Sequence, residues 1–320
     1  MFSLQLRMTL LLAALFGIVY AIVVMVGTAM GVTDFYFYLV LSLGMMFLQY
    51  MIGPKIVEWS MRVRYIKRQD APELFGMVEE QARRAGIPVP RVCISDLNIP
   101  NAFAFGRGVR DGRVCVTRGI MDLLNGEELK AVIGHELGHI KNRDVLTITL
   151  LSVIPMILYR IAWQTMFMGG RRDDRNSGAV AMIGIASFLF YFISNLLVLY
   201  ASRIREYFAD KASVEFGNRP AALASALYKL VYGSARMPRE ELREAEGLKA
   251  FFLNDPSHAL DEFRDLKKLD LDHSGSIEAS ELARLRDKKV RVGSSDKLME
   301  LLSTHPNMLK RIKHLSELAA

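Results

Sequence analysis

The chain has 320 residues, of which 51% are hydrophobic, and its mean hydropathy is +0.19. This is too apolar for an ordinary soluble domain of this length, so the composition excludes a simple water-soluble globule and predicts membrane spans. The formal net charge of +7 indicates basic flanks of such spans rather than a nucleic-acid surface, because the sequence lacks interleaved aromatic and basic residues.

Two apolar runs open the chain, at residues 8–30 and 35–52. Each is long enough to cross about 30 Å of hydrocarbon, which needs roughly 20 residues. The short turn between them carries no Lys or Arg, whereas Arg7 precedes the pair and several basic residues follow it. The positive-inside rule therefore predicts an uncleaved transmembrane hairpin over 1–53, with both ends in the cytoplasm.

Polar residues and a mixture of short elements follow, from residue 54 to residue 144. Pro72 to Ala85 has the pattern of an amphipathic helix that Gly86 closes. Three short β-branched or aromatic runs predict strands, with Asp111-Gly112 as a hairpin turn: 91–95, 102–105 and 113–117. This is an α+β pattern.

The two cysteines, Cys93 and Cys115, each lie in a short apolar, β-branched run. Such surroundings are typical of buried core residues. The pair therefore does not imply a disulfide, and nothing in the sequence requires an oxidising compartment.

A helix with a marked start follows the third strand. Asn125 can cap it while Glu128 reciprocates, which is a capping box. His135 and His139 then lie one turn apart on the same side, and Glu136 lies about 100° round the axis. Two imidazoles so placed can hold one Zn²⁺ while the carboxylate reaches a water molecule, which is the H-E-x-x-H arrangement of a metalloprotease.

Two more apolar runs, 145–168 and 178–200, define a second hydrophobic segment over 145–201. The link between them holds three Arg and two Asp, which fits an outside loop poorly. Two interpretations remain open: two full spans, or a hairpin that dips into the membrane and returns. Either one places His139 and the residues after Tyr200 in the same compartment.

The third metal ligand must come from a distant part of the chain, because Asn142 and Val145 stand where a metzincin has Gly and His. Glu206 and Asp210, one helical turn apart, follow the fourth apolar run. In a His₂Glu site, Glu206 would bind zinc and Asp210 would hold a ligand imidazole by its far N–H. The alternative is a surface helix whose Arg and acidic residues only pair with one another.

The order of these motifs resembles the HtpX family of membrane-bound zinc proteases, relatives of the CAAX prenyl endopeptidases. The resemblance rests on the transmembrane hairpin and four short segments: Asn101 to Ala104, His135 to His139, Glu206 to Asp210, and Ser303 to Pro306. It implies a mainly α, α+β protein with a gluzincin-like domain and a multi-pass inner-membrane location. It also implies a cytoplasmic active site and a stress-response role in the turnover of damaged membrane proteins.

The resemblance also implies residue roles. His135, His139 and Glu206 would bind one zinc ion, Glu136 would be the general base, and Asp210 would orient a ligand histidine. The edge that binds extended substrate would be formed by Asn101, Ala102, Phe103 and Ala104. His305 would stabilise the oxyanion with Arg311 as a charge partner, although a His-Pro pair can also simply start a helix. The catalytic domain would comprise residues 54–144, 202–257 and 297–320.

The remaining insert, residues 258–296, departs from that family pattern. Residues 270–281 match the 12-residue EF-hand loop, with Gly275 at position six. The candidate calcium ligands are Asp270, Asp272, Ser274, Ser276, Glu278 and Glu281. The alternative is a polar helix-turn-helix whose acidic and Ser residues only cap helices.

Three functions follow from these patterns. The main hypothesis is a zinc endopeptidase that degrades misfolded or membrane polypeptides in the bilayer. A second is the processing of one defined substrate, such as a prenylated or signal-derived peptide. A third is a Ca²⁺-responsive membrane scaffold, against which the complete set of candidate ligands argues.

Overall fold

The computed structural model describes residues 50–144, 177–236, 266–287 and 300–319, together with Phe47 and isolated positions between 147 and 162. The chain divides into two compact units. The first comprises residues 1–52 and 146–204, and the second comprises residues 53–145 and 205–320.

The second unit contains a four-stranded sheet with the order β1-β2-β4-β3. The strands are β1 (Val63–Tyr65), β2 (Arg91–Ser95), β3 (Ala102–Gly106) and β4 (Gly112–Thr117). The sequence predicts the last three strands but not β1, whose three residues are too few for a period-two pattern. Strands β2 and β4 are parallel neighbours, and β3 pairs antiparallel with β4 at the end of the order, so β3 is an edge strand among the described residues.

The connection from β3 to β4 is longer than the predicted Asp111-Gly112 turn. A 3₁₀ helix, η1 (Val109–Asp111), occupies it, and Gly112 is already the first residue of β4. Gly106, at φ 143°, lets the backbone of Asp111 come close to the end of β3, because a Cβ there would lie 2.2 Å from the Asp111 carbonyl oxygen. The two-residue hairpin was therefore wrong in length.

The cysteines occupy neighbouring positions of the parallel strands. Cys93 is the register partner of Cys115, and both thiols are free and fully buried. Their predicted role as core residues is confirmed.

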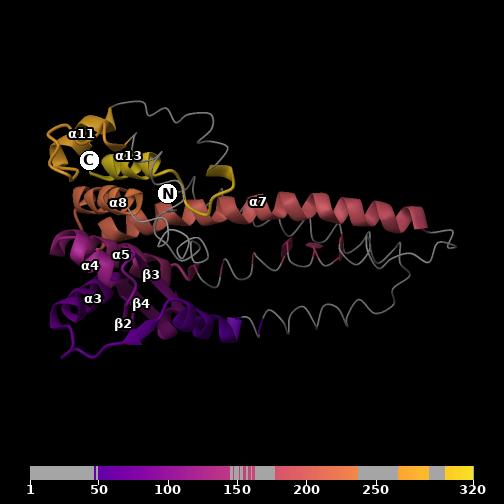
Figure 1. Ribbon diagram of the computed structural model, residues 1–320, viewed down its shortest axis with the longest axis horizontal. Helices are drawn as coiled ribbons and strands as arrows, with labels where there is room; N and C mark the ends of the chain where they lie inside the picture. The colour runs from indigo at the N-terminus through magenta and orange to yellow at the C-terminus, as the bar shows by residue number, and fades with distance from the viewer. Residues whose placement is uncertain are drawn as a thin grey trace. The chain divides into compact units, whose positions relative to one another are not determined.

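The helices of the second unit are α3 (Pro72–Ala85), α4 (Arg118–Leu123), α5 (Gly126–Lys141), α8 (Pro220–Ala235), α11 (Ala279–Arg286) and α13 (Met308–Leu318). Helices α4 and α5 contact the sheet, whereas α8, α13 and α11 lie progressively farther from it (Figure 1). The predicted helix 72–85 and its closing residue, Gly86 in the left-handed conformation, are confirmed. Helix α8 packs between α5 and α13, and α5 also contacts α3 and β3.

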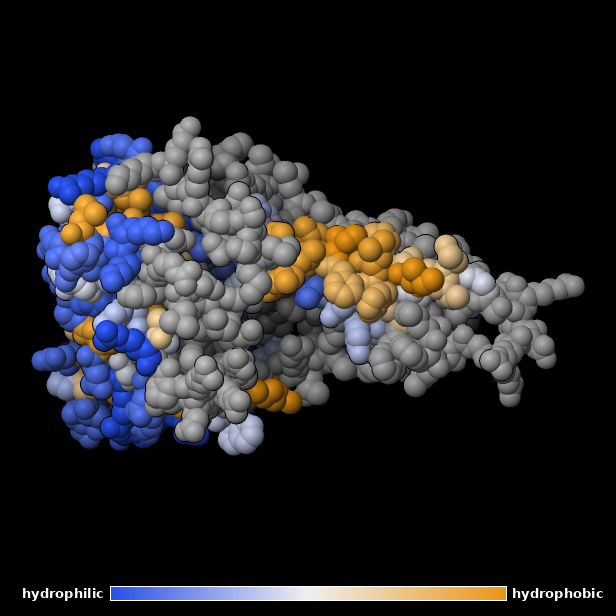
Figure 2. All heavy atoms as spheres, turned by 45° about the horizontal axis from the view of Figure 1, so that its top comes forward, coloured by the Kyte–Doolittle hydropathy of each residue, from blue (hydrophilic) through white to orange (hydrophobic). Residues whose placement is uncertain are grey.

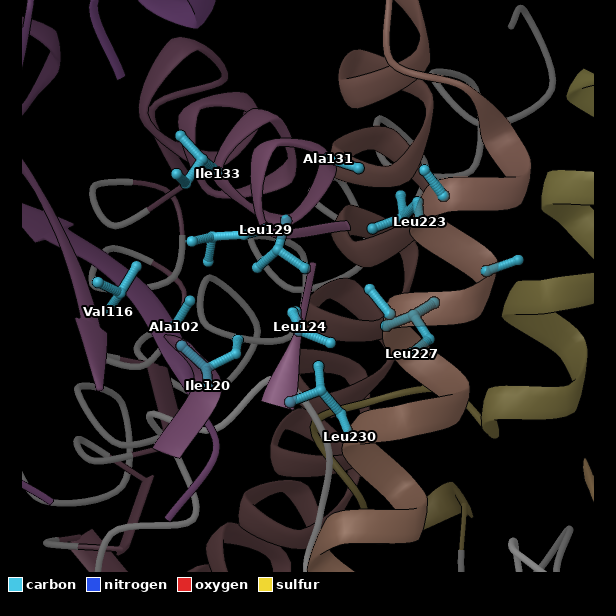
Figure 3. Close-up of a cluster of buried hydrophobic side chains, with 14 of the residues drawn as sticks. Ala102, Val116, Ile120, Leu124, Leu129, Ala131, Ile133, Leu223, Leu227 and Leu230 are labelled. Atoms are coloured by element: carbon cyan, nitrogen blue, oxygen red, sulfur yellow. The ribbon is translucent and has the colours of Figure 1, made fainter. Parts of the chain in front are cut away.

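The core of this unit lies where the sheet, α5 and α8 meet (Figure 3). Side chains of the sheet and of the segment that follows it contact those of α5 and α8. The labelled members are Ala102, Val116, Ile120, Leu124, Leu129, Ala131, Ile133, Leu223, Leu227 and Leu230. Burial of each large apolar side chain stabilises the fold by about 1.5–3 kcal/mol. This core therefore supports α5 rigidly.

Helix α7 (Ser177–Glu215) belongs to the first unit up to Ile204 and to the second from Arg205. It is the one described helix long and apolar enough to cross a membrane. Figure 2 shows hydrophobic side chains gathered along its apolar part, where Met182 and Ile185 are exposed. The predicted fourth apolar run and the Glu206 segment therefore form one unbroken helix.

The other predicted apolar runs are described only in part. Residues 8–30 and most of 35–52 lie outside the described residues. At the described positions of the run 145–168 the chain is helical, and Leu151, Ile154 and Leu158 form a buried cluster with Val198 and Ala201. Four spans therefore stay a prediction.

Candidate active site

The helix α5 forms as its sequence predicts. Asn125 accepts a hydrogen bond from the Glu128 backbone N–H, and the Glu128 carboxylate accepts one from Asn125 N–H, each at 2.9 Å. Buried Glu128 also contacts Lys229 and Ser225 of α8. The capping box thus sets both the start of α5 and its rotation, which decides where the two histidines point.

Three candidate ligands converge in the second unit. The Nε2 atoms of His135 and His139 lie 3.1 Å apart, and Glu206 carboxylate oxygens lie 3.5 Å and 3.6 Å from them. Tetrahedral ligands at about 2.0–2.1 Å from zinc would stand roughly 3.3 Å apart. The buried Oε2 atom of Glu206 forms an ion pair with Arg311 Nη1 at 3.0 Å but accepts no well-aligned hydrogen bond among the described residues. The donor set therefore fits a zinc ion.

Each imidazole is held from behind by a carboxylate. Asp210 Oδ1 lies 2.8 Å from Nδ1 of His135, and Asp144 Oδ2 lies 2.6 Å from Nδ1 of His139. A carboxylate can only accept, so each Nδ1 carries the proton and each Nε2 is free to face the other ligands. Sequence analysis named Asp210 but missed Asp144, which lies just beyond the end of α5.

Burial and these hydrogen-bond partners shift the pKa values of the side chains in the site. Burial by itself would lower the pKa of His135, but hydrogen bonds to Asp210 and Glu206 raise it to about 9. Burial would raise the pKa of Asp144, yet the His139 hydrogen bond and Arg205 outweigh it and lower that pKa. Because a histidine binds metal only as the neutral imidazole, zinc binding should strengthen as pH rises.

Glu136 lies beside the three ligands without joining them. Its side chain is buried, which raises its pKa, and the neighbouring imidazoles and a hydrogen bond from Ala104 N–H act in the opposite direction. A carboxylate with a raised pKa close to a reacting water molecule is suited to general base catalysis.

Arg311 of α13 binds two of the site's carboxylates. Its Nη2 and Nε atoms donate to Asp210 at 2.6 Å and 3.0 Å, and Nη1 lies 3.0 Å from Glu206 Oε2. The guanidinium is fully buried. Arg311 was expected to act as a charge partner beside His305, and the contacts found for it include Asp210 and Glu206.

His305 also reaches the site, with Nδ1 3.6 Å from Glu206 Oε1. Both of its ring nitrogens are buried and have no hydrogen-bond partner within the described residues. Its ring nitrogens are therefore available to form a hydrogen bond with a polar group of a bound substrate.

The predicted substrate edge lies at the free side of β3. Thr117 N–H donates to Asn101 carbonyl oxygen at 2.9 Å, so Asn101 faces β4. Because antiparallel residues alternate, Ala102 and Ala104 direct their backbone polar groups to the free edge, whereas Phe103 faces β4. The hydrogen bond from Ala104 to Glu136 places this edge beside Glu136 and the three candidate ligands.

Close packing of α5 against α7 depends on two glycines. A Cβ at Gly138 would lie 2.9 Å from Ala212 Cβ and 3.2 Å from Ala209 Cα. A Cβ at Gly134 would lie 3.0 Å from Ser213 Oγ of α7 and 2.3 Å from Nδ2 of Asn218, which follows α7. The glycine face of α5 thus lets the backbone carrying Glu206 approach the two histidines.

We expect Gly138→Ala to weaken zinc binding and to destabilise the protein by about 1–3 kcal/mol, because overpacking drives α5 and α7 apart. Zinc affinity measured by chelator competition checks this. Gly76→Ala in α3 is the matched control, since a Cβ there meets nothing within 4 Å. A Gly138→Ala protein with unchanged affinity would contradict the close-packing argument.

A family model described as Peptidase family M48 matches residues 68–319. The chain belongs to peptidase family M48. It is therefore a metalloprotease, as the sequence predicted, and M48 membership argues against the scaffold hypothesis.

Curated relatives in this family carry the name of HtpX homologues. A protease HtpX homolog of Methanothermobacter thermautotrophicus is 53% identical over 229 residues, which cover 72% of this chain and 86% of the relative. One of Moorella thermoacetica is 35% identical over 280 residues, covering 86% and 81%. The resemblance to HtpX proteins is thus confirmed.

The fold resembles that of the crystal structure of S. mikatae Ste24p, with a TM-score of 0.51 and 15% identity. The match covers 98% of this chain and 67% of that protein. The predicted mainly helical fold with a sheet is confirmed at this level.

Proposed function

We propose that this M48 protein is a zinc-dependent membrane endopeptidase that hydrolyses peptide bonds of membrane or misfolded proteins. The observation that carries the proposal is the convergence of His135, His139 and Glu206, whose ligand atoms all lie within 4.8 Å of one another. The set combines two neutral nitrogen donors with one carboxylate, which is the donor chemistry of catalytic zinc sites.

The chain's own residues divide the chemistry between them. Zinc, held by His135, His139 and Glu206, supplies activation of a water molecule and polarisation of the scissile carbonyl. Glu136 takes the proton from the attacking water and returns it to the leaving amine, for which its raised pKa suits it.

We assign oxyanion stabilisation to His305. Its buried ring nitrogens make no hydrogen bond within the described part of the chain, so one of them can donate to a substrate oxygen that gains negative charge. Arg311 has a different task. It neutralises Asp210 and Glu206, since its guanidinium already binds both carboxylates.

The edge formed by Asn101, Ala102, Phe103 and Ala104 is assigned to substrate binding. An extended peptide that pairs with the free side of β3 gains affinity from backbone hydrogen bonds and imposes little side-chain preference. Such pairing suits unfolded polypeptides of varied sequence, and so favours quality control over the processing of one defined peptide.

We place the catalytic residues on the cytoplasmic side of a multi-pass protein in the inner membrane. The basic residues that follow the first apolar pair support this side, and the exposed apolar side chains of α7 support membrane insertion. The proposed organisation is a hairpin over 1–53, a second over 145–201, and catalytic segments over 54–144, 202–257 and 297–320.

Proteolysis by the full chain, purified in detergent, tests the function. We expect cleavage of casein that o-phenanthroline abolishes and that stoichiometric zinc restores, with one zinc ion bound per chain. Full proteolytic activity of a zinc-free preparation would contradict the proposed function. So would a zinc-loaded preparation that cleaves neither casein nor unfolded membrane proteins.

We propose in addition that the insert over 258–296 binds Ca²⁺. Beyond the 12-residue pattern, its support is the approach of carboxylate oxygens of Asp270, Asp272 and Glu281 to within 4.8 Å of one another. The other proposed ligands are Ser274, Ser276 and Glu278. Isothermal titration of the full chain should show heat with Ca²⁺ that Asp270→Ala removes, and no heat at millimolar ion would contradict the proposal.

A further inference from the structure

Asp144 contacts His139, but the proposed function assigns it no role. Helix α5 ends at Lys141, and the chain then turns through Arg143, whose φ of 56° is left-handed. A non-glycine residue in this region costs of order 1 kcal/mol, which surrounding contacts must offset. The turn brings the Asp144 carboxylate back to His139 Nδ1, at 2.6 Å.

The second carboxylate oxygen of Asp144 contacts α7. Oδ1 lies 3.0 Å from Nε of Arg205, and Asp144 is only 3% exposed. Arg205 directly precedes Glu206, the third candidate ligand. One buried carboxylate therefore joins the imidazole of His139 to the helix that carries the opposing ligand.

The arrangement repeats what is seen behind the other histidine. There, His135 contacts Asp210, and Asp210 is held by Arg311. In both cases a histidine Nδ1 meets a buried carboxylate beside an arginine of another element. Arg311 donates two hydrogen bonds to its carboxylate, whereas Arg205 forms an ion pair with Asp144 at 3.0 Å. A carboxylate that only stabilised the fold through an ion pair would not need to direct an oxygen atom at Nδ1 of a candidate ligand histidine.

We propose that Asp144, anchored by Arg205, is the positioning residue of His139, so that each candidate ligand histidine has its own carboxylate–arginine pair. This inference rests on the proposed function. Asp144 keeps the proton on Nδ1, directs Nε2 toward His135 and Glu206, and prevents rotation of the ring. Arg205 holds the carboxylate in the orientation that allows this.

The direct readout is metal affinity of the full chain in detergent, measured by zinc competition with a chelator. Loss of a carboxylate behind a ligand histidine costs 10–100-fold in affinity. We expect about that loss for Asp144→Ala and a smaller one for Arg205→Ala. Asp144→Asn, nearly the same shape, should fall between wild type and Asp144→Ala. Asp122→Ala, at an exposed position of α4, is the control and should bind as wild type does.

The absorption spectrum of the Co²⁺-loaded protein separates positioning from a structural role. Positioning predicts an altered d–d band in Asp144→Ala and a band closer to wild type in Asp144→Asn. A structural role would lower the melting temperature of zinc-free and zinc-loaded protein alike and leave affinity and spectrum unchanged, which would overturn the inference.

The two proposals fail in different ways. If wild type binds zinc and cleaves casein while Asp144→Asn and Asp144→Ala bind zinc with wild-type affinity, the positioning role is wrong and the protease assignment stands. If wild type binds no zinc, or His139→Ala binds it as wild type does, both are wrong.

Discussion

Replacing Glu136 by Gln should abolish peptide hydrolysis while zinc binding persists. Glu136 is buried beside His135 but is not one of the three converging ligands. Gln has the same shape and can still accept the hydrogen bond from Ala104 N–H, so the local structure should survive. What it lacks is basicity, and loss of a general base costs about 10²–10⁴-fold in rate.

The measurement is casein cleavage and zinc content of the same detergent preparation. Glu127→Gln, one residue from the start of α5, is the matched control, because that side chain is 69% exposed and pairs with Arg219. Near wild-type hydrolysis by the Glu136→Gln protein would remove Glu136 from the mechanism, whereas loss of zinc would show that it supports the metal.

Replacing Arg311 by Ala should produce the largest loss of stability. The guanidinium is fully buried and lies against both Asp210 and Glu206. Its removal leaves two buried carboxylates without their cation, and breaking a buried pair in this way costs about 3–5 kcal/mol. The loss should be greater without zinc, because a bound zinc ion supplies positive charge to Glu206.

Thermal unfolding with and without zinc checks this expectation. Arg311→Lys should recover only part of the stability, since an ammonium group cannot reproduce the two-point contact with Asp210. Arg118→Ala is the control: that residue and its partner Asp96 are 56% and 47% exposed, and surface pairs contribute about 0–1 kcal/mol. Equal effects of Arg311→Ala and Arg118→Ala would contradict the role of the buried pair.

The sequence by itself determined the local elements and most of the candidate site. The capping box of Asn125 and Glu128 and the one-turn spacing of His135 and His139 are short-range patterns that α5 reproduces. The position of Glu206 after the fourth apolar run made it the candidate for the third ligand. Such features are predictable because a helix converts spacing along the chain directly into position on a face.

Only the tertiary structure decided how these parts meet. The β1–β2 pairing, the approach of α5 to α7 at Gly138, and the contacts of Arg311 all join residues far apart in sequence. Asp144 and Arg205 belong to this group, although each is adjacent to a motif that the sequence revealed. Their roles depend on side-chain direction and on which helix packs against which, and no periodic pattern encodes either.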